Sequence, residues 1–344
     1  MYKIRKLDEQ AIENAEKKWN SIAKPLHSLG VFEDIVKNIA GIQGTQNIDI
    51  KKRCVLVMCA DNGVVCEGVT QTGQEVTAVV TENFAKGATS VCAMARNIGA
   101  DVVPIDVGVA RDVDGVVNKK ISYGTKNMLH EKAMTYEQAK EAVQVGIDCV
   151  KELSGKGYKI IVTGEMGIGN TTTSSAVASV LLDRKAEDVT GRGAGLTSGA
   201  LERKIEVIKK SIELHKPDKN NIFDVLSKVG GYDIAALTGA FIGGAMYGVA
   251  MVIDGFISSV AALCAEKLCP KCSDFMIASH VSKESCTADI LKILGKKAPI
   301  NADMCLGEGT GGMVMLTALD TALCVYNEMS TFDDINVESY KELK

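Results

Sequence analysis

One glutamate in the sequence has glycine on both sides. Glu308 lies in the loop Leu306–Gly312, directly before the apolar helical pattern Met313–Val325. Its carboxylate could simply cap that helix, because acidic side chains are favoured near helix N-termini. Flanking glycines, however, weaken a helix start and leave the carboxylate clear of bulky neighbours. The spacing therefore leaves two interpretations open: a helix cap, or a carboxylate that reaches a flat ligand and works as an acid–base group.

A second loop, residues 164–172, follows the apolar pattern Lys159–Thr163 and opens a helical pattern. Three glycines allow a ligand close to its backbone, and the segment from Asn170 to Thr172 offers cap side chains and N–H groups. A tight turn with an ordinary cap is the alternative, but it needs fewer glycines. The loop has neither the Walker A ending nor the spacing of a dinucleotide fingerprint. We favour an anion site at a helix N-terminus.

The glycine-rich segment 191–195 precedes a helical pattern that carries Arg203 and Lys204. Glycines with nearby cations suit a phosphate, although a flexible surface loop beside a solvated helix would look the same. Two weaker candidates follow predicted strands. Asp254 either holds a ligand or caps the helix that begins near Phe256, and His280 either lines the site or is structural.

Strand-like and helix-like patterns alternate between these loops. Strands are predicted at Cys54–Ala60, Val102–Val109, Lys159–Thr163, Val249–Ile253 and Asp274–Ala278, and helices at 75–98, 135–153, 170–182, 199–213, 256–268, 283–294 and 311–328. The alternation predicts an α/β fold, a mostly parallel sheet with helices on both faces in a Rossmann-like three-layer arrangement. Ligands of such sheets bind beyond the carboxyl ends of the strands, where the candidate loops would meet.

Composition narrows the range of functions. The 344 residues carry a net charge of −4, which argues against nucleic acid as a partner. Eleven scattered cysteines and a charged start without an apolar segment indicate reduced thiols in the cytoplasm. The pair Cys269 and Cys272 is read as a turn rather than a zinc site, because no second ligand pair accompanies it. The apolar stretch Leu237–Leu263 is read as helix, strand and helix, not as a membrane span, because Asp254 and Gly255 interrupt it.

These motifs together resemble the nicotinate-nucleotide–dimethylbenzimidazole phosphoribosyltransferase family of cobamide biosynthesis. The resemblance covers about Leu29 to Met329. It is carried by the order of its pieces: Met58-Cys59-Ala60-Asp61-Asn62-Gly63-Val64, Glu75-Val76-Thr77, Gly164-Glu165-Met166-Gly167, Asn170-Thr171-Thr172, Leu226-Ser227-Lys228-Val229-Gly230-Gly231, Asp254-Gly255-Phe256, Ser279-His280 and Leu306-Gly307-Glu308-Gly309.

The resemblance implies transfer of phosphoribosyl from nicotinate mononucleotide to an aromatic lower-ligand base, with nicotinate leaving and an α-riboside 5′-phosphate forming. Glu308 would accept the acceptor's proton, and Glu165 would lie near the ribose or the acceptor. The nucleotide and its phosphate would be bound by Gly167, Asn170, Thr171, Gly193, Lys204, Ser282 and Asp254. The resemblance further implies no metal or organic cofactor, a dimer, a small helical domain from residues 1–45 and 300–344, and a large α/β nucleotide-binding domain from residues 46–299.

The chain departs from the family pattern around the predicted acceptor pocket, which comprises Asn62, Thr72, Gln74, Val80 and Leu306. Many members have His in place of Asn62, a Ser-Pro or aromatic-Pro pair in the region of Thr72 to Gln74, and in some a Gln at Val80. With fewer polar groups, the pocket could instead accept a purine or a phenol. Relatives that use phenols work beside a paralogous subunit, which keeps a heterodimer open.

Two rival functions remain. A transferase that uses phosphoribosyl pyrophosphate would carry paired acidic residues after a strand, whereas Asp254 stands alone. A non-catalytic paralogue that only binds the nucleotide would have no reason to retain Glu308.

Overall fold

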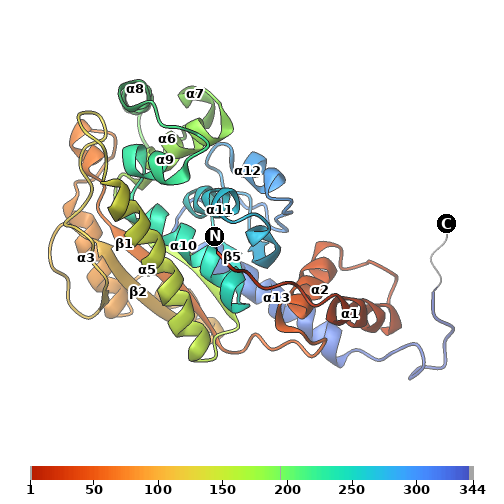
Figure 1. Cartoon of the computed structure of the whole chain (residues 1–344). Coiled ribbons are helices and arrows are strands. Elements are labelled where there is room, and N and C mark those ends of the chain that lie inside the picture. Colours follow the sequence, from red (N-terminus) through yellow and green to blue (C-terminus); the bar gives the residue numbers. More distant parts are fainter. Residues whose placement is uncertain (1, 194, 341–344) are drawn as a thin grey trace.

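A computed structural model describes residues 2–193 and 195–340 of the chain. Its sheet has six strands, all parallel, in the order β3-β2-β1-β4-β5-β6 (Figure 1). The strands are β1 (Arg53–Ala60), β2 (Asp101–Gly108), β3 (Val117–Asn118), β4 (Ile160–Met166), β5 (Ala250–Ile253) and β6 (Met276–Ala278). Beyond Arg53, every residue of β1 is buried, as expected of a strand covered on both faces. The predicted parallel α/β fold is confirmed.

Helices cover both faces of the sheet (Figure 1). On one face α5 (Tyr136–Gly155), α10 (Tyr232–Tyr247) and α11 (Phe256–Leu268) pack together, and on the other lie α3 (Glu75–Ala85), α4 (Ser90–Ile98) and α13 (Thr310–Glu328). The remaining helices are α1 (Glu9–Ser21), α2 (Val31–Gln43), α6 (Asn170–Leu182), α7 (Ala186–Val189), α8 (Ser198–His215), α9 (Ile222–Val229) and α12 (Thr287–Ile293), with short 3₁₀ turns at Gly63–Glu67 and Cys272–Phe275.

Four details of the predicted elements are wrong. Strand β4 continues to Met166 instead of ending at Thr163, so Gly164 and Glu165 lie in the strand and not in the loop after it. The single helix expected over 75–98 is two helices, because the chain turns at Gly87, whose φ is +70°. The strand expected from Asp274 begins only at Met276, after a 3₁₀ turn. The helix expected over 283–294 spans only Thr287–Ile293, because residues 279–286 form a loop that lines the site.

The glycine-rich stretch Leu237–Leu263 forms the end of α10, then β5, then most of α11, as predicted. Its glycines serve close packing. A Cβ on Gly239 would lie 1.8 Å from the carbonyl oxygen of Val143, so only glycine lets α10 lie this close to α5. In the described part of the chain, no helix is long and apolar enough to span a membrane. Cys269 and Cys272 lie in the turn between α11 and β6, also as predicted.

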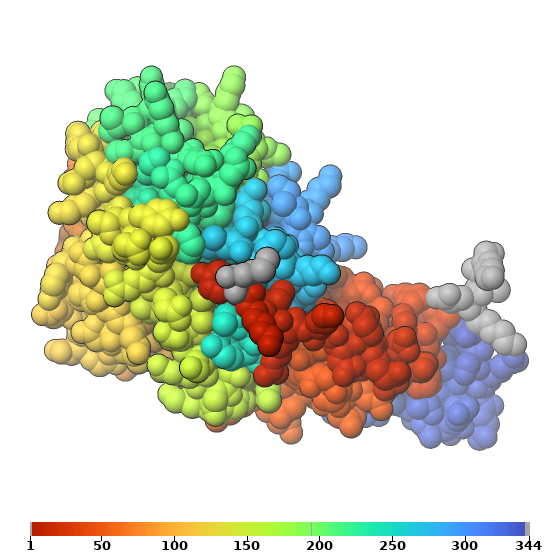
Figure 2. All heavy atoms as spheres, in the orientation of Figure 1, coloured from red at the N-terminus to blue at the C-terminus, as the bar shows by residue number. Residues whose placement is uncertain are grey.

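Helices α1 and α2 project from the main body together with the end of α13, and we call this region the terminal lobe (Figures 1 and 2). The rings of Trp19 and Tyr326 contact each other with centroids 4.8 Å apart. Lys24 and Glu33 form a buried ion pair, with 2.6 Å between Nζ and Oε1. The first turns of α13, in contrast, pack on the sheet beside β4, where Gly312 lies against Val162. The division into domains at residues 45 and 300 stays a prediction.

Candidate active site

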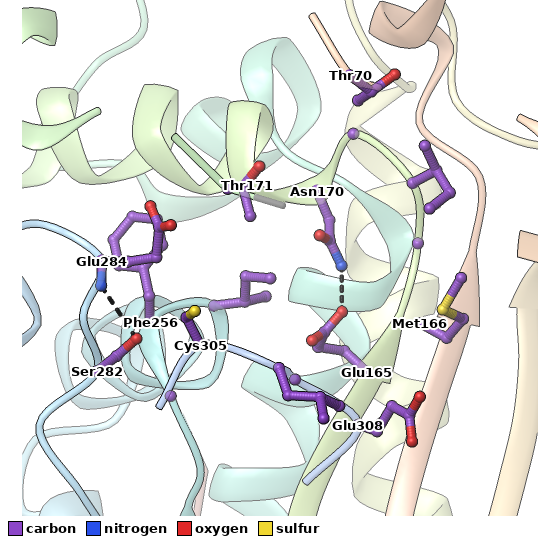
Figure 3. A pocket seen from close by; sticks show the side chains of 18 of the residues that line it. Thr70, Glu165, Met166, Asn170, Thr171, Phe256, Ser282, Glu284, Cys305 and Glu308 are labelled. Atoms are coloured by element: carbon purple, nitrogen blue, oxygen red, sulfur yellow. Dashed lines mark hydrogen bonds between the residues drawn. The ribbon is translucent and has the colours of Figure 1, made fainter. Parts of the chain in front are cut away.

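A cavity lies beyond the carboxyl ends of the central strands, where the parallel sheet predicts a ligand site (Figure 3). The loops after β4, β5 and β6, the segment before α13 and residues of the 192–204 region all contribute to it. Of the predicted site residues, eleven line this cavity: Glu308, Glu165, Gly167, Asn170, Thr171, Gly193, Lys204, Ser282, Asp254, Thr72 and Leu306. The candidate loops therefore converge as expected.

Glu308 is held in an unusual backbone conformation. It has a φ of +61° and lies between Gly307 at +89° and Gly309 at +92°, so three successive residues are left-handed. Such a conformation is costly for a residue with a side chain, and it persists only where surrounding contacts enforce it. One of these contacts is the close approach of the Glu308 carbonyl to β4. A Cβ on Gly164 would lie 2.5 Å from that oxygen.

The Glu308 side chain does not cap its own helix. Its Oε2 accepts a hydrogen bond of 3.0 Å from the backbone N–H of Val91, in the first turn of α4. The positive end of the α4 dipole therefore faces this carboxylate. In Figure 3 the carboxylate is directed away from Glu165. The capping alternative considered for the sequence thus does not apply to α13.

Asp254 caps α13 instead. Its two carboxylate oxygens accept hydrogen bonds from the N–H groups of Gly309, at 3.2 Å, and Gly312, at 3.0 Å. Gly311 is required here because a Cβ on it would lie 2.0 Å from Nδ1 of His280. Burial raises the pKa of Asp254 to about 7, although these hydrogen bonds act in the opposite direction. Asp254 lines the cavity, but these contacts serve the Glu308 loop, so its predicted nucleotide contact stays a prediction.

Glu165 is another of the carboxylates that line the cavity, and it is the last-but-one residue of β4. Its Oε2 accepts a hydrogen bond from Nδ2 of Asn170, and the same nitrogen donates to Oδ2 of Asp233 at 3.0 Å (Figure 3 shows the first contact). Both amide hydrogens of Asn170 are therefore directed at carboxylates rather than at an anionic ligand. The predicted role of Asn170 in nucleotide binding stays a prediction.

The opposite side of the cavity carries positive charge. Nζ of Lys204 donates to Oγ1 of Thr171, 2.9 Å away, and to the carbonyl oxygen of Gly191, 3.3 Å away. Burial lowers the pKa of Lys204 to about 8, while the nearby Glu284 carboxylate acts to raise it. Thr171 is in the first turn of α6, so the ammonium group and a helix N-terminus face the same space.

Two further residues complete this side. Gly193 has a φ of +54°, and a Cβ there would lie 3.0 Å from Oγ1 of Thr171, so glycine keeps room beside the Lys204 contact. Oγ of Ser282 accepts a hydrogen bond from the N–H of Glu284. In Figure 3, Ser282 and Glu284 lie on the side of the cavity away from Glu165 and Glu308. One end of the cavity therefore has the Lys204 ammonium group beside the Glu284 carboxylate, and the other end has the carboxylates of Glu165 and Glu308. We call the first the cationic end, after Lys204, and the second the acidic end.

The predicted acceptor pocket is only partly assembled in the cavity. Thr72 and Leu306 line it, and Leu306 is more than half exposed, at 57%. Asn62 is fully buried and accepts a hydrogen bond of 3.2 Å from Oγ1 of Thr173, outside the lining residues. Gln74 and Val80 are also outside the lining and are only partly buried. A role for these three in acceptor choice stays a prediction.

Sequence reasoning missed several residues of the site. Asp233 is wholly buried in the first turn of α10 and had no signal beyond being an isolated acid in an apolar helix. Glu284 lines the cavity with one carboxylate oxygen, Oε2, that has no hydrogen-bond partner in the described structure. The cavity is also lined by Arg192 and Phe256. Both lie in segments that were predicted to belong to the site, Arg192 in the glycine-rich segment 191–195 and Phe256 just after Asp254.

Comparisons with known proteins identify the family of the chain. A family model described as "Phosphoribosyltransferase" matches residues 4–337. The chain is 47% identical to the nicotinate-nucleotide–dimethylbenzimidazole phosphoribosyltransferase of Acetivibrio thermocellus, over 98% of this chain and 97% of that protein. It is also 47% identical to the protein of the same name from Clostridium acetobutylicum, over 99% and 97% of the two chains. The crystal structure of CobT from Thermus thermophilus superposes with a TM-score of 0.89 at 32% identity, over 96% of this chain and 99% of that chain. The chain belongs to the nicotinate-nucleotide–dimethylbenzimidazole phosphoribosyltransferase family.

Proposed function

We propose that this enzyme transfers the phosphoribosyl group of nicotinate mononucleotide to an aromatic lower-ligand base, with dimethylbenzimidazole as the first acceptor to test. The products are nicotinate and an α-riboside 5′-phosphate, a building block for cobamide biosynthesis. The names of the relatives support this reaction, and so does the charge distribution of the cavity. Nicotinate mononucleotide has an anionic phosphate at one end and, at the other, a ring whose nitrogen next to C1′ is cationic and whose carboxylate lies on the far side of the ring. In the cavity, the Lys204 ammonium group could face the phosphate, and the carboxylates of Glu165 and Glu308 could face the cationic ring nitrogen.

The phosphate would bind at the cationic end. Lys204 supplies a buried ammonium group, Thr171 a hydroxyl at the start of α6, and Ser282 a second hydroxyl. Gly193 leaves space beside Lys204 for the phosphate oxygens, and Gly167, which also lines the cavity, would contribute its backbone. A charged donor beside a helix N-terminus is a common way to bind phosphate, since the helix dipole and the ammonium charge act together.

The glycosyl transfer would take place at the acidic end. A ring nitrogen of the acceptor attacks C1′, the bond from C1′ to the pyridinium nitrogen breaks, and the bonding electron pair neutralises the leaving nicotinate ring. The acceptor must then lose the proton from its second ring nitrogen. Glu308 would take it, because its Oε2 is bound to Val91 and its Oε1 remains for the acceptor. Glu165 would face the ribose or the acceptor, and its negative form would stabilise positive charge that builds up on C1′.

One reaction mixture tests the proposal. The purified enzyme is incubated with nicotinate mononucleotide and an equimolar mixture of dimethylbenzimidazole, adenine, phenol and p-cresol. We expect release of nicotinate together with one dominant riboside phosphate, identified by mass. Binding of the nucleotide without release of nicotinate would instead support the rival non-catalytic function. Product with phenol or cresol alone would favour the phenolic alternative.

We further propose that the enzyme works in the cytoplasm as a dimer, either a homodimer or a heterodimer with a paralogue. All eleven cysteines are free thiols, in keeping with a reducing compartment. An apolar groove between α4 and α13, which includes Met94, Ile98 and Val314, is the surface we expect a dimer to bury. Light scattering of the purified chain, with Met94→Glu as the variant, tests this expectation.

A further inference from the structure

The amide of Asn170 connects two buried carboxylates. Its Nδ2 donates to Glu165, which faces the cavity, and to Asp233, which lies behind it on α10. We propose that Glu165 and Asp233 form a pair that holds one proton in the empty site and releases it when the cationic ring of the substrate binds. Asp233 is then a positioning residue that controls the charge of Glu165. The inference rests on the proposed function, because it requires nicotinate mononucleotide as the ligand.

The surrounding backbone keeps the pair compact. A Cβ on Gly167 would lie 2.7 Å from Oδ2 of Asp233, and a Cβ on Gly231 would lie 2.5 Å from its Oδ1. The Asp233 carboxylate also accepts a hydrogen bond of 3.0 Å from the N–H of Ile234. Asp233 therefore has a fixed place, where it is hydrogen-bonded to the side chains of Asn170 and Asn62 and reaches Glu165 through Asn170.

The charged groups around the pair are almost all acidic. Asp254, after β5, and Glu308, before α13, both disfavour a negative charge on Glu165. The thiol of Cys59 on β1 is the other titratable neighbour, and burial together with nearby carboxylates raises its pKa. Among the described residues, no Lys or Arg forms an ion pair with Glu165 or Asp233. Two neighbouring carboxylates without a cation cannot both ionise easily.

The pKa values of Glu165 and Asp233 are both raised, as expected for two carboxylates that share one proton. Burial raises the pKa of Glu165 to about 8, and Asp233 adds to this rise, although the hydrogen bond from Asn170 opposes it. Burial raises the pKa of Asp233 to about 6. Both pKa values are raised, so the pair resists double ionisation, and in the proposed free enzyme it keeps one proton near neutral pH. A pyridinium cation in the cavity favours the doubly ionised form, so its binding lowers the pKa of Glu165 and drives a proton into solution.

Calorimetry measures this proton directly. Nicotinate mononucleotide is titrated into the enzyme near pH 7 in buffers of different ionisation enthalpy, and the slope of the observed heat against that enthalpy gives the number of protons released. Ribose 5-phosphate is the matched ligand, because it has the same phosphate but no cationic ring. We expect the nucleotide to release up to about one proton more than ribose 5-phosphate. The difference should vanish above about pH 9, where Glu165 is ionised before binding.

Two variants identify the source of the proton. Glu165→Gln preserves the shape of the side chain, and it should abolish the difference between the two ligands. Asp233→Asn removes the neighbouring like charge, and the pH at which the release is half-maximal should fall by about half a unit or more. An unchanged midpoint in Asp233→Asn overturns the proposal.

If Asp233→Asn does not fold, the Glu165→Gln variant provides the test. If Glu165→Gln still releases more protons with the nucleotide than with ribose 5-phosphate, the shared-proton proposal is overturned. Binding of the nucleotide to the wild type without proton release refutes the shared proton and leaves the proposed function intact. No binding of the nucleotide at all refutes the proposed function itself.

Discussion

Replacing Glu308 by glutamine tests the central chemical assignment. The amide oxygen of the introduced side chain can still accept the N–H of Val91, which lies 3.0 Å from the carboxylate in the wild type, so the left-handed loop keeps its contact with α4. The amide cannot accept a proton from the acceptor. Loss of a general base lowers kcat by about 10²- to 10⁴-fold, which corresponds to about 2.7–5.4 kcal/mol in the activation free energy. KM for nicotinate mononucleotide should change little, because Lys204 and Thr171, the proposed phosphate contacts, lie at the other end of the cavity.

Steady-state release of nicotinate, with saturating dimethylbenzimidazole, measures both constants. Glu213→Gln is the matched control, since Glu213 is exposed on α8 and outside the cavity lining. Thermal unfolding of both variants should match that of the wild type. The reasoning is refuted if Glu308→Gln retains near-normal kcat, or if its loss lies entirely in KM.

The remaining predictions concern Lys204 as a proposed phosphate contact, the loop that carries Glu308, and the ion pair in the terminal lobe. Lys204→Met should raise KM for the nucleotide about 10- to 100-fold, the scale of a charged hydrogen bond, with a smaller effect on kcat, in steady-state assays. Because the pKa of Lys204 in the free enzyme is lowered to about 8 by burial, its positive charge is lost as pH rises through that value, and nucleotide affinity measured by titration should fall there. Gly164→Ala places a Cβ 2.5 Å from the carbonyl oxygen of Glu308, so kcat should fall by about tenfold or more while the protein still folds, as circular dichroism would show. Glu33→Ala leaves Lys24 buried without its partner and should lower the free energy of unfolding in urea by about 3 kcal/mol, whereas Glu16→Ala, in a more exposed ion pair, should change it little.

The fold and the convergence of the loops were predictable because both follow from local patterns. Buried apolar runs such as β1 alternate with helical patterns, and this implies a parallel sheet. The carboxyl ends of parallel strands share one edge, so loops after different strands must meet there. Glu165, Asp254 and Ser282 were found by this rule although they are far apart in the sequence. The break between α3 and α4 had a weaker signal, because one glycine within an apolar pattern does not by itself end a helix.

The partner of each carboxylate was not predictable, because the contacts that decide it are distant in the sequence. Glu308 precedes α13 but binds the start of α4, 217 residues away, and Asp254 precedes α11 but caps α13. Each acid lies next to a helix that it could cap locally, so local rules assign it to the wrong helix.

The role of Asp233 was not predictable either, although local rules explain its position. As an acid in the first turn of α10, it looks like a helix-stabilising residue, and it does accept the N–H of Ile234. Stability alone, however, gives no reason to place it beside Glu165, because a buried carboxylate without a cation costs free energy and a second one nearby adds to that cost. Asn170 offsets only part of this cost by donating to both. Glu165 faces the cavity and Asp233 lies behind it. A pair that is unfavourable for the folded protein is best explained here by the cationic ring nitrogen that the proposed substrate brings next to Glu165.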